Sequence, residues 1–171
     1  MGQIICAIIT DKKTDYNKDL VHFSEGEVVI IPIDINENTI EYFIREAENF
    51  IRIEEYLNFL KKFPDTEKSD SRHKHNIYSI IDIIETYQLD NFAIQYYTEW
   101  GDIPVDNFYL AVINSKIKED SIILEDDKFD ANYDNKEKYN NIIGLNFSWL
   151  ANEERYYNYA KSEKDYLKNL K

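Results

Sequence analysis

The sequence has one cysteine, four glycines and three prolines among its 171 residues. A single cysteine excludes an intramolecular disulfide and a cysteine-based zinc cluster. This residue, Cys6, lies in the apolar run IICAII, where burial keeps a thiol protonated and unreactive, so we do not expect it to act as a nucleophile. With so few glycines there is little scope for a glycine-rich phosphate loop, and no such motif is present.

Positive charge is also scarce. The chain carries 20 Lys and Arg residues against 33 Asp and Glu residues, a formal net charge of −13. Such a protein repels phosphate backbones and anionic lipid, so we expect no direct binding to nucleic acid or to a membrane surface. A basic protein partner would be attracted instead.

The first ten residues, MGQIICAIIT, lack the basic n-region of a secretion signal and are too short to span a bilayer. We therefore expect a cytoplasmic protein. Abundant Ile, Asn, Lys, Glu and Tyr indicate an AT-rich genome, which is typical of bacteria or phages.

What the chain does contain is apolar and aromatic side chains, at 43% and 15% of its residues. This content predicts a folded protein despite the high charge. No internal repeat, linker or break in composition divides residues 1–171, so we expect a single domain. No motif indicates a cofactor.

Hydrophobic periodicity predicts an α+β fold with a mostly antiparallel sheet of about five to six strands, a mixed sheet being the alternative, and about three helices on one face. The expected helices span 38–62, 76–87 and 150–169. The run QIICAIIT predicts a strand buried on both faces, and NFAIQYYTEW alternates as a half-buried strand does. We expect residues 125–141 to form a loop. The other expected strands are VVIIPIDI, NFYLAVIN and IIGLNFSW, with LVHF and SIILE as shorter candidates.

The stretch DANYDN places Asp130, Asn132 and Asp134 at the spacing of the first three ligands of an EF-hand calcium loop. The match ends there, because position 6 of the loop is not glycine, position 8 is Glu137 and position 12 is Asn141. A solvated loop is the better interpretation of this stretch.

A second weak metal candidate is the pair His73 and His75, which stand two residues apart in a polar connector. Alternate histidines on a strand can share a face and bind zinc, but the sequence shows no third ligand. Polar surface is the better interpretation here too.

The distribution of charge is more informative than these motifs. Between Lys74 and Lys116 there is no Lys or Arg, although six acidic residues lie there. The interval includes an expected aromatic hairpin, in which tyrosine supplies contact area and carboxylates steer a basic partner. The predicted partner-binding residues are Tyr97, Glu99, Asp102 and Asp106.

These features favour a non-enzymatic acidic binding protein of the inhibitor or immunity type, which neutralises a basic partner such as a bacterial nuclease toxin or a nucleic-acid-binding defence protein. The alternative is a metal-dependent enzyme or metal-binding protein that uses His73 and His75 or the stretch from Asp130 to Asp134. A second alternative is a structural subunit of a homo-oligomer. The sequence leaves the oligomeric state open.

Overall fold

The computed structural model describes residues 4–33, 47, 49–60, 80–100, 103–123 and 129–145. At 4–6, 25, 60, 96–100, 103–107 and 129–133 it describes the backbone and not the side chains. The elements in chain order are β1 (Ile4–Thr10), β2 (Phe23–Glu25), β3 (Val28–Pro32), α2 (Ile53–Leu60), α3 (Ile80–Tyr87), β4 (Phe92–Trp100), β5 (Ile103–Ile113), β6 (Lys116–Ile117), the 3-10 turn η2 (Glu119–Ser121) and α4 (Phe129–Ile143).

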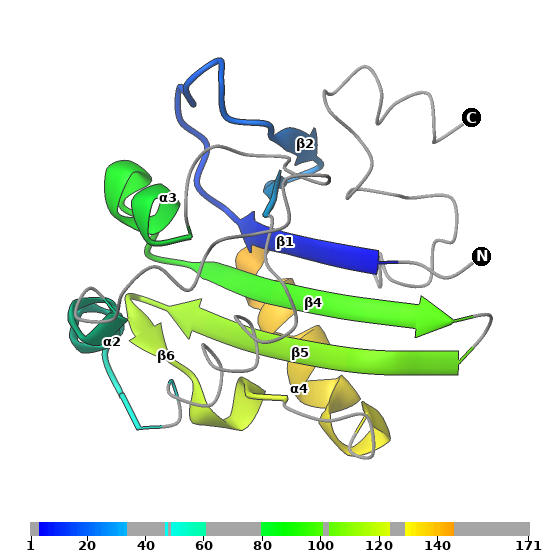
Figure 1. The fold of residues 1–171 in the computed structure, drawn as a ribbon. Coiled ribbons are helices and arrows are strands. Elements are labelled where there is room, and N and C mark those ends of the chain that lie inside the picture. Colours follow the sequence, from blue (N-terminus) through cyan, green and yellow to red (C-terminus); the bar gives the residue numbers. More distant parts are fainter. Residues whose placement is uncertain are drawn as a thin grey trace, which may run out of the picture.

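The described strands form one six-stranded sheet in the order β2-β3-β1-β4-β5-β6, and each neighbouring pair is antiparallel (Figure 1). β1 lies in the interior of the sheet, where Ile8 pairs with Ile31 on one side and with Ile94 on the other. This arrangement confirms the predicted α+β class and the predicted number of strands. Burial of β1 on both faces is also confirmed from Ala7 to Thr10, which are fully buried.

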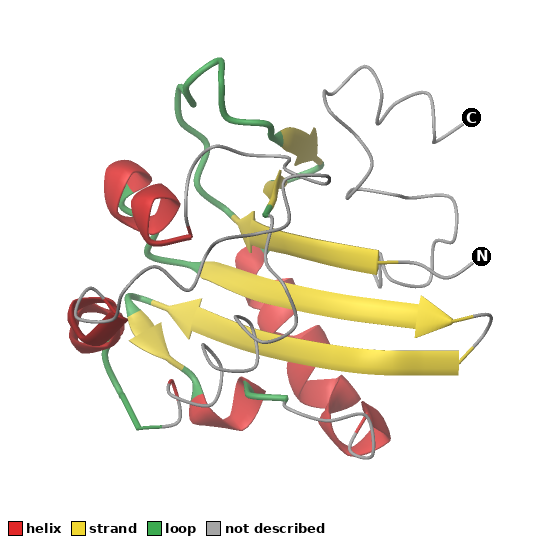
Figure 2. Cartoon of the chain, in the orientation of Figure 1, coloured by secondary structure: helices red, strands yellow, loops and turns green. Residues whose placement is uncertain are grey.

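Helices cover both faces of the sheet, whereas the sequence predicted them on one face. α4 passes behind the sheet in the view of Figure 2, and it packs against β4, β5 and η2. α2 and α3 belong to the core on the other face, which we call the first face. Side chains of α2, α3 and the sheet make up this core, among them Ile8, Tyr56, Ile83, Phe92, Ile94 and Leu110.

The core on the second face, under α4, is built from smaller side chains. Alanines on three adjacent strands, Ala7, Ala93 and Ala111, are fully buried there. Because these strands present small alanine side chains to α4, the helix can approach the sheet closely. β4 is thus covered on both faces over residues 92–95, so the prediction of a half-buried strand is wrong for this part.

The predicted helix over 38–62 is interrupted. Residues 53–60 are helical, but residues 49–52 form a turn and a bridge to β6, and residues 34–46 lie outside the described part. Ile53 donates its N–H to the Ser115 carbonyl at 3.2 Å, and the Ile51 carbonyl accepts the N–H of Ile117 at 3.2 Å. These backbone groups are bonded to the β5–β6 segment, so they cannot form the hydrogen bonds of a continuous helix.

The prediction of a loop over 125–141 is wrong for residues 129–141, which are helical in α4, and the strand predicted over 142–149 is wrong at its start, because Ile142 and Ile143 end this helix. Residues 125–128 and 146–149 lie outside the described part. Among the side chains of this helix that are described, at residues 134–143, the buried ones are Lys136, Tyr139, Asn140 and Ile143, at the i, i+3, i+4, i+7 spacing of a docking face. Two of these four residues are strongly polar, which concealed the helical period.

In the described part of SIILE, Ser121 ends η2 and Ile123 forms one isolated bridge with Tyr109. Residues 124 and 125 lie outside the described part. The strand next to β5 is the two-residue β6. The predicted C-terminal helix over 150–169 lies outside the described residues. Among the helices that are described, none has the length and the apolar character needed to cross a bilayer.

Gly144 ends α4 with a backbone conformation that favours glycine. Its φ is +111°, its N–H bonds the Asn141 carbonyl at 3.1 Å, and Leu145 N–H bonds the Asn140 carbonyl at 2.8 Å. This pair of bonds is a Schellman motif. We expect Gly144→Ala to lower the free energy of unfolding by about 1–3 kcal/mol in urea titrations followed by circular dichroism.

Gly26 provides the matched control. It has a φ of +57° in the β2–β3 turn, and a Cβ there would have no atom within 4 Å, whereas a Cβ on Gly144 would lie 3.3 Å from the Glu27 Cβ. Gly26→Ala should therefore add backbone strain without a steric clash, and its free energy of unfolding should fall by less than that of Gly144→Ala. Equal losses at the two positions would contradict a steric contribution at Gly144.

Candidate functional site

The predicted partner-binding residues fall at one end of the β4–β5 hairpin. Tyr97 and Glu99 lie on β4, Asp106 lies on β5 opposite Thr98, and the pairing shifts register between Thr98 and Glu99. Asp102 is outside the described residues. The backbone thus brings Tyr97, Glu99 and Asp106 close together along the ladder, and their binding role stays a prediction.

The predicted metal candidates do not form a site in the described part of the chain. Asp130, Asn132 and Asp134 lie in the first half of α4. The backbone there is helical, so it is neither the solvated loop that the sequence favoured nor the loop of an EF-hand. His73 and His75 lie outside the described residues, and within those residues no group of three or more His, Cys, Asp or Glu side chains could hold a metal ion.

The outward side of α3 is acidic. Asp82 and Glu85 are exposed, one turn apart, and Ile80, Ile83 and Ile84 are buried against the sheet. The amphipathic pattern of the helix fixes this orientation, because its apolar stripe must face the core. α3 belongs to the interval without Lys or Arg that the sequence revealed.

The loop after β1 packs on α3 through aromatic rings. The Tyr16 ring lies 4.7 Å from the Tyr87 ring and 5.0 Å from the His22 ring, centroid to centroid. Asn17 N–H donates to the Tyr87 hydroxyl at 3.1 Å, and the Tyr16 hydroxyl donates to the Lys12 carbonyl. Burial, with smaller contributions from Tyr87 and Asp11, raises the pKa of Tyr16 to about 12, so its phenol stays neutral.

This packing joins the loop after β1, which carries exposed carboxylates, to α3, which carries two more. We call the combined group the acidic surface, and its members are Asp11, Asp15, Asp19, Asp82 and Glu85, all exposed. The same loop carries three lysines, of which Lys13 forms an ion pair with Glu27 at 2.8 Å. With five carboxylates against three lysines, the two segments joined by this half-buried aromatic cluster carry an excess of negative charge.

Asp90 also belongs to the interval without bases, but it has a structural role. Its Oδ1 accepts a hydrogen bond from Ser115 Oγ at 2.7 Å, and its carbonyl accepts the Ser115 N–H at 2.9 Å. Asn91 Oδ1 accepts the Asn114 N–H at 2.8 Å. Asn114 and Ser115 have φ values of 53° and 58°. Asparagine adopts this left-handed conformation readily but serine does not, so these bonds hold a tight turn that is unfavourable at Ser115.

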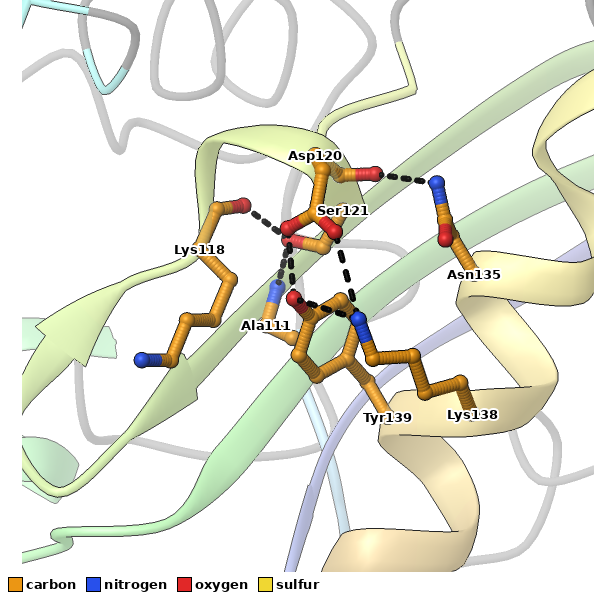
Figure 3. A network of polar contacts seen from close by, with 7 residues as sticks. All are labelled: Ala111, Lys118, Asp120, Ser121, Asn135, Lys138 and Tyr139. Atoms are coloured by element: carbon orange, nitrogen blue, oxygen red, sulfur yellow. Dashed lines mark hydrogen bonds and ion pairs between the residues drawn. The ribbon is translucent and has the colours of Figure 1, made fainter.

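A surface network ties η2 to α4 (Figure 3). The Asp120 carboxylate accepts hydrogen bonds from the Tyr139 hydroxyl and, at 3.4 Å, from Lys138 Nζ. The Asp120 backbone carbonyl accepts a hydrogen bond from Asn135 Nδ2 at 3.0 Å. The bond from Tyr139 is the main cause that holds the pKa of Asp120 below its usual range. These contacts fix the position of η2 relative to the helix.

Beneath this network, a buried polar cluster joins α4 to β5. Its members are Tyr109, Lys136 and Asn140, which are 0%, 4% and 6% exposed. The Tyr109 hydroxyl donates to Asn140 Oδ1 at 2.7 Å, and Lys136 Nζ lies 5.7 Å from the Tyr109 ring centroid. Burial lowers the pKa of Lys136 to about 7 and raises the pKa of Tyr109 well above its ordinary value.

Sequence reasoning missed this buried cluster. Lys136 and Asn140 lie in a stretch of alternating acids, bases and amides that resembles a polar loop. The helix could have been found from two four-residue spacings, one between Lys136 and Asn140 and one between Tyr139 and Ile143. Comparisons with protein-family models, with curated proteins and with solved structures find no match to this chain.

Proposed function

We propose that this protein is a non-enzymatic inhibitor or immunity-type protein that neutralises a basic protein partner in the cytoplasm. A nuclease toxin or a nucleic-acid-binding defence protein is the class of partner that fits. The observation that carries the proposal is the acidic surface: five exposed carboxylates lie on the two segments that the Tyr16–Tyr87 contact joins, on a chain with a net charge of −13.

The physical argument starts from what such a partner must bind. A protein that binds nucleic acid presents lysine and arginine to phosphates, and a surface rich in carboxylates can occupy the same positions. Electrostatic attraction of this kind raises association rates by roughly 10- to 1,000-fold at low salt. Aromatic rings among the carboxylates add contact area and can stack with arginine.

The geometry of α3 suits this role. Asp82 and Glu85 are on the exposed side of a helix whose other side is held in the core by three isoleucines. A surface built on an anchored helix reorganises little on binding, which limits the entropy lost in the complex. The β4–β5 hairpin with Tyr97, Glu99 and Asp106 is a second candidate contact region of the same partner.

The test is coexpression with the protein encoded by the adjacent reading frame of the same genome. We expect a one-to-one complex on size-exclusion chromatography, loss of the partner's nuclease or nucleic-acid-binding activity in it, and an association rate that falls at least roughly tenfold between about 50 and about 500 mM NaCl. If the two proteins elute separately and the partner stays active, the proposal is wrong.

A further inference from the structure

The loop between β1 and β2 is fixed at both of its ends. At its start, Asn91 Nδ2 donates a hydrogen bond to Asp11 Oδ2 at 3.0 Å. At its other end, Leu20 is 2% exposed and belongs to the core on the first face of the sheet. Two of the five carboxylates of the acidic surface, those of Asp15 and Asp19, lie on the backbone between these ends.

The middle of this loop contacts Tyr87, the last residue of α3. The Tyr16 ring lies 4.7 Å from the Tyr87 ring, centroid to centroid, with an angle of 55° between the ring planes. The next residue, Asn17, donates its N–H to the Tyr87 hydroxyl at 3.1 Å. One contact involves a side chain of the loop and the other involves its backbone, so together they fix both the position and the direction of this part of the loop.

A turn connects this contact to the acidic residues. Asn17 Oδ1 accepts the N–H of Asp19 at 3.1 Å. Asparagine favours such turns because its side-chain oxygen can bond to the backbone two residues later. On the other side, Asp15 directly precedes Tyr16 in the chain. The backbone positions of both acidic residues therefore follow from where α3 holds this part of the loop.

Tyr87 is itself fixed by the helix that carries it. Ile83 and Ile84 of α3 are buried in the core on the first face, and Tyr87 follows them by four and three positions, so it lies on the same side of the helix. Its ring packs against that core. The same helix carries Asp82 and Glu85 on its exposed side. Tyr87 thus connects the acidic residues of the loop to those of α3 through one docked helix.

We propose that Tyr87 is a positioning residue of the acidic surface, and that it holds Asp15 and Asp19 in a fixed arrangement relative to Asp82 and Glu85. This inference rests on the function proposed above, because it requires a basic partner that binds this surface. Groups that are fixed before binding lose less conformational entropy in a complex than mobile groups do. Tyr87 therefore contributes to affinity through the loop and without adding charge.

This role affects the two rate constants of binding differently. Long-range attraction depends on the charges, which are unchanged when Tyr87 is replaced by a neutral residue, so the association rate should change little. Short-range contacts determine the dissociation rate, and these contacts need the loop in its place. Replacement of Tyr87 should therefore raise the dissociation rate.

The first measurement is amide hydrogen exchange of the intact protein without a partner, followed by NMR and corrected for intrinsic exchange rates. In Tyr87→Phe, which keeps the ring and removes the hydroxyl acceptor, the Asn17 amide should exchange roughly 2- to 10-fold faster than in the unmodified protein. Tyr87→Leu also removes the ring, so the amides of residues 16–19 should exchange faster still.

Tyr139→Phe is the matched control for this measurement. It removes the same hydroxyl group from the network between η2 and α4, where that hydroxyl bonds Asp120. The Asn17 amide should exchange in this variant as it does in the unmodified protein. Equal exchange of the Asn17 amide in Tyr87→Phe and in the unmodified protein would overturn the proposal, whatever the partner is.

The second measurement is the dissociation rate of the complex with the basic partner. Tyr87→Phe and Tyr87→Leu should raise this rate by roughly 2- to 10-fold and leave the association rate at about 50 mM NaCl within about twofold, whereas Tyr139→Phe should change neither. Faster exchange of the Asn17 amide with an unchanged dissociation rate would overturn the positioning role. If the unmodified protein binds no basic partner, the function proposed above is wrong and the positioning role falls with it, but faster Asn17 exchange would still show that Tyr87 holds the loop.

Discussion

Tyr109→Ala should lower the free energy of unfolding by about 3–5 kcal/mol, the cost of removing a large buried aromatic side chain. The residue is fully buried in β5, under α4. Because a domain of this size has about 5–15 kcal/mol of stability in total, the loss is a large part of it. Thermal unfolding followed by circular dichroism should show a decrease in the midpoint of about 6–20 °C.

Tyr109→Phe separates the hydroxyl from the ring. The ring stays, but Asn140 Oδ1 loses the hydroxyl that donates to it at 2.7 Å, and burial of a polar atom without that bond costs about 1–3 kcal/mol. Tyr139→Phe is the matched control, since its hydroxyl bonds the exposed Asp120, which water can solvate in its place. If the two phenylalanine variants have the same midpoint temperature of unfolding, the buried Tyr109–Asn140 hydrogen bond stabilises the protein no more than the exposed Tyr139–Asp120 bond does.

The strands of the sheet could be predicted because their residues obey simple rules. β1, β3, β4 and β5 are β-branched and aromatic runs, and such runs favour a pleated, buried surface whatever surrounds them. The short α3 could be predicted equally well, since Ile80, Ile83 and Ile84 share one helical face. Local chemistry and tertiary structure agree in all these elements.

The elements that could not be predicted depend on contacts distant in sequence. The helix expected over 38–62 is broken at 49–52 because β6, some 65 residues later, supplies hydrogen bonds to this segment. Likewise, α4 is helical although its sequence is polar, because Tyr139 and Ile143 pack on the sheet. Single-sequence periodicity carries no information on such pairings.

The candidate site was predictable only as a charge pattern. The interval between Lys74 and Lys116 includes Asp82 and Glu85, which are exposed on α3. From the same interval the sequence predicted a contact on the β4–β5 hairpin, and that contact stays a prediction. The sequence could not show that the loop with Tyr16 packs on Tyr87, about 70 residues away. It also could not show that Asp90 is used to hold the turn at Ser115.

Two double variants with the same change in net charge distinguish a docking surface from the general attraction of an acidic protein. Asp82→Asn with Glu85→Gln removes two negative charges from α3, on the first face of the sheet. Asp134→Asn with Glu137→Gln removes two exposed negative charges from α4, on the second face. Each variant replaces a carboxylate by an amide of nearly the same shape, and each pair is one turn apart on its helix.

If the acidic surface docks the basic partner, the α3 variant should bind it roughly tenfold more slowly at about 50 mM NaCl, because charges near the contact dominate steering. The α4 variant should lose less than about threefold, and both differences should shrink at about 500 mM NaCl, where the screening length falls to a few Å. Stopped-flow fluorescence measures these rates. Thermal midpoints within about 3 °C of the unmodified protein would show that folding is retained.

A third double variant, Glu99→Gln with Asp106→Asn, extends the same comparison to the β4–β5 hairpin. This variant also removes two negative charges. If it slows association more than the α3 variant does, the partner contacts Tyr97 and its neighbours, as the sequence alone predicted. Equal slowing by all three variants would mean that the partner responds to total charge and that the acidic surface has no special role. A defined interface for the basic partner is supported only if the slowing of association depends on where the charges are removed and is smallest for the α4 variant.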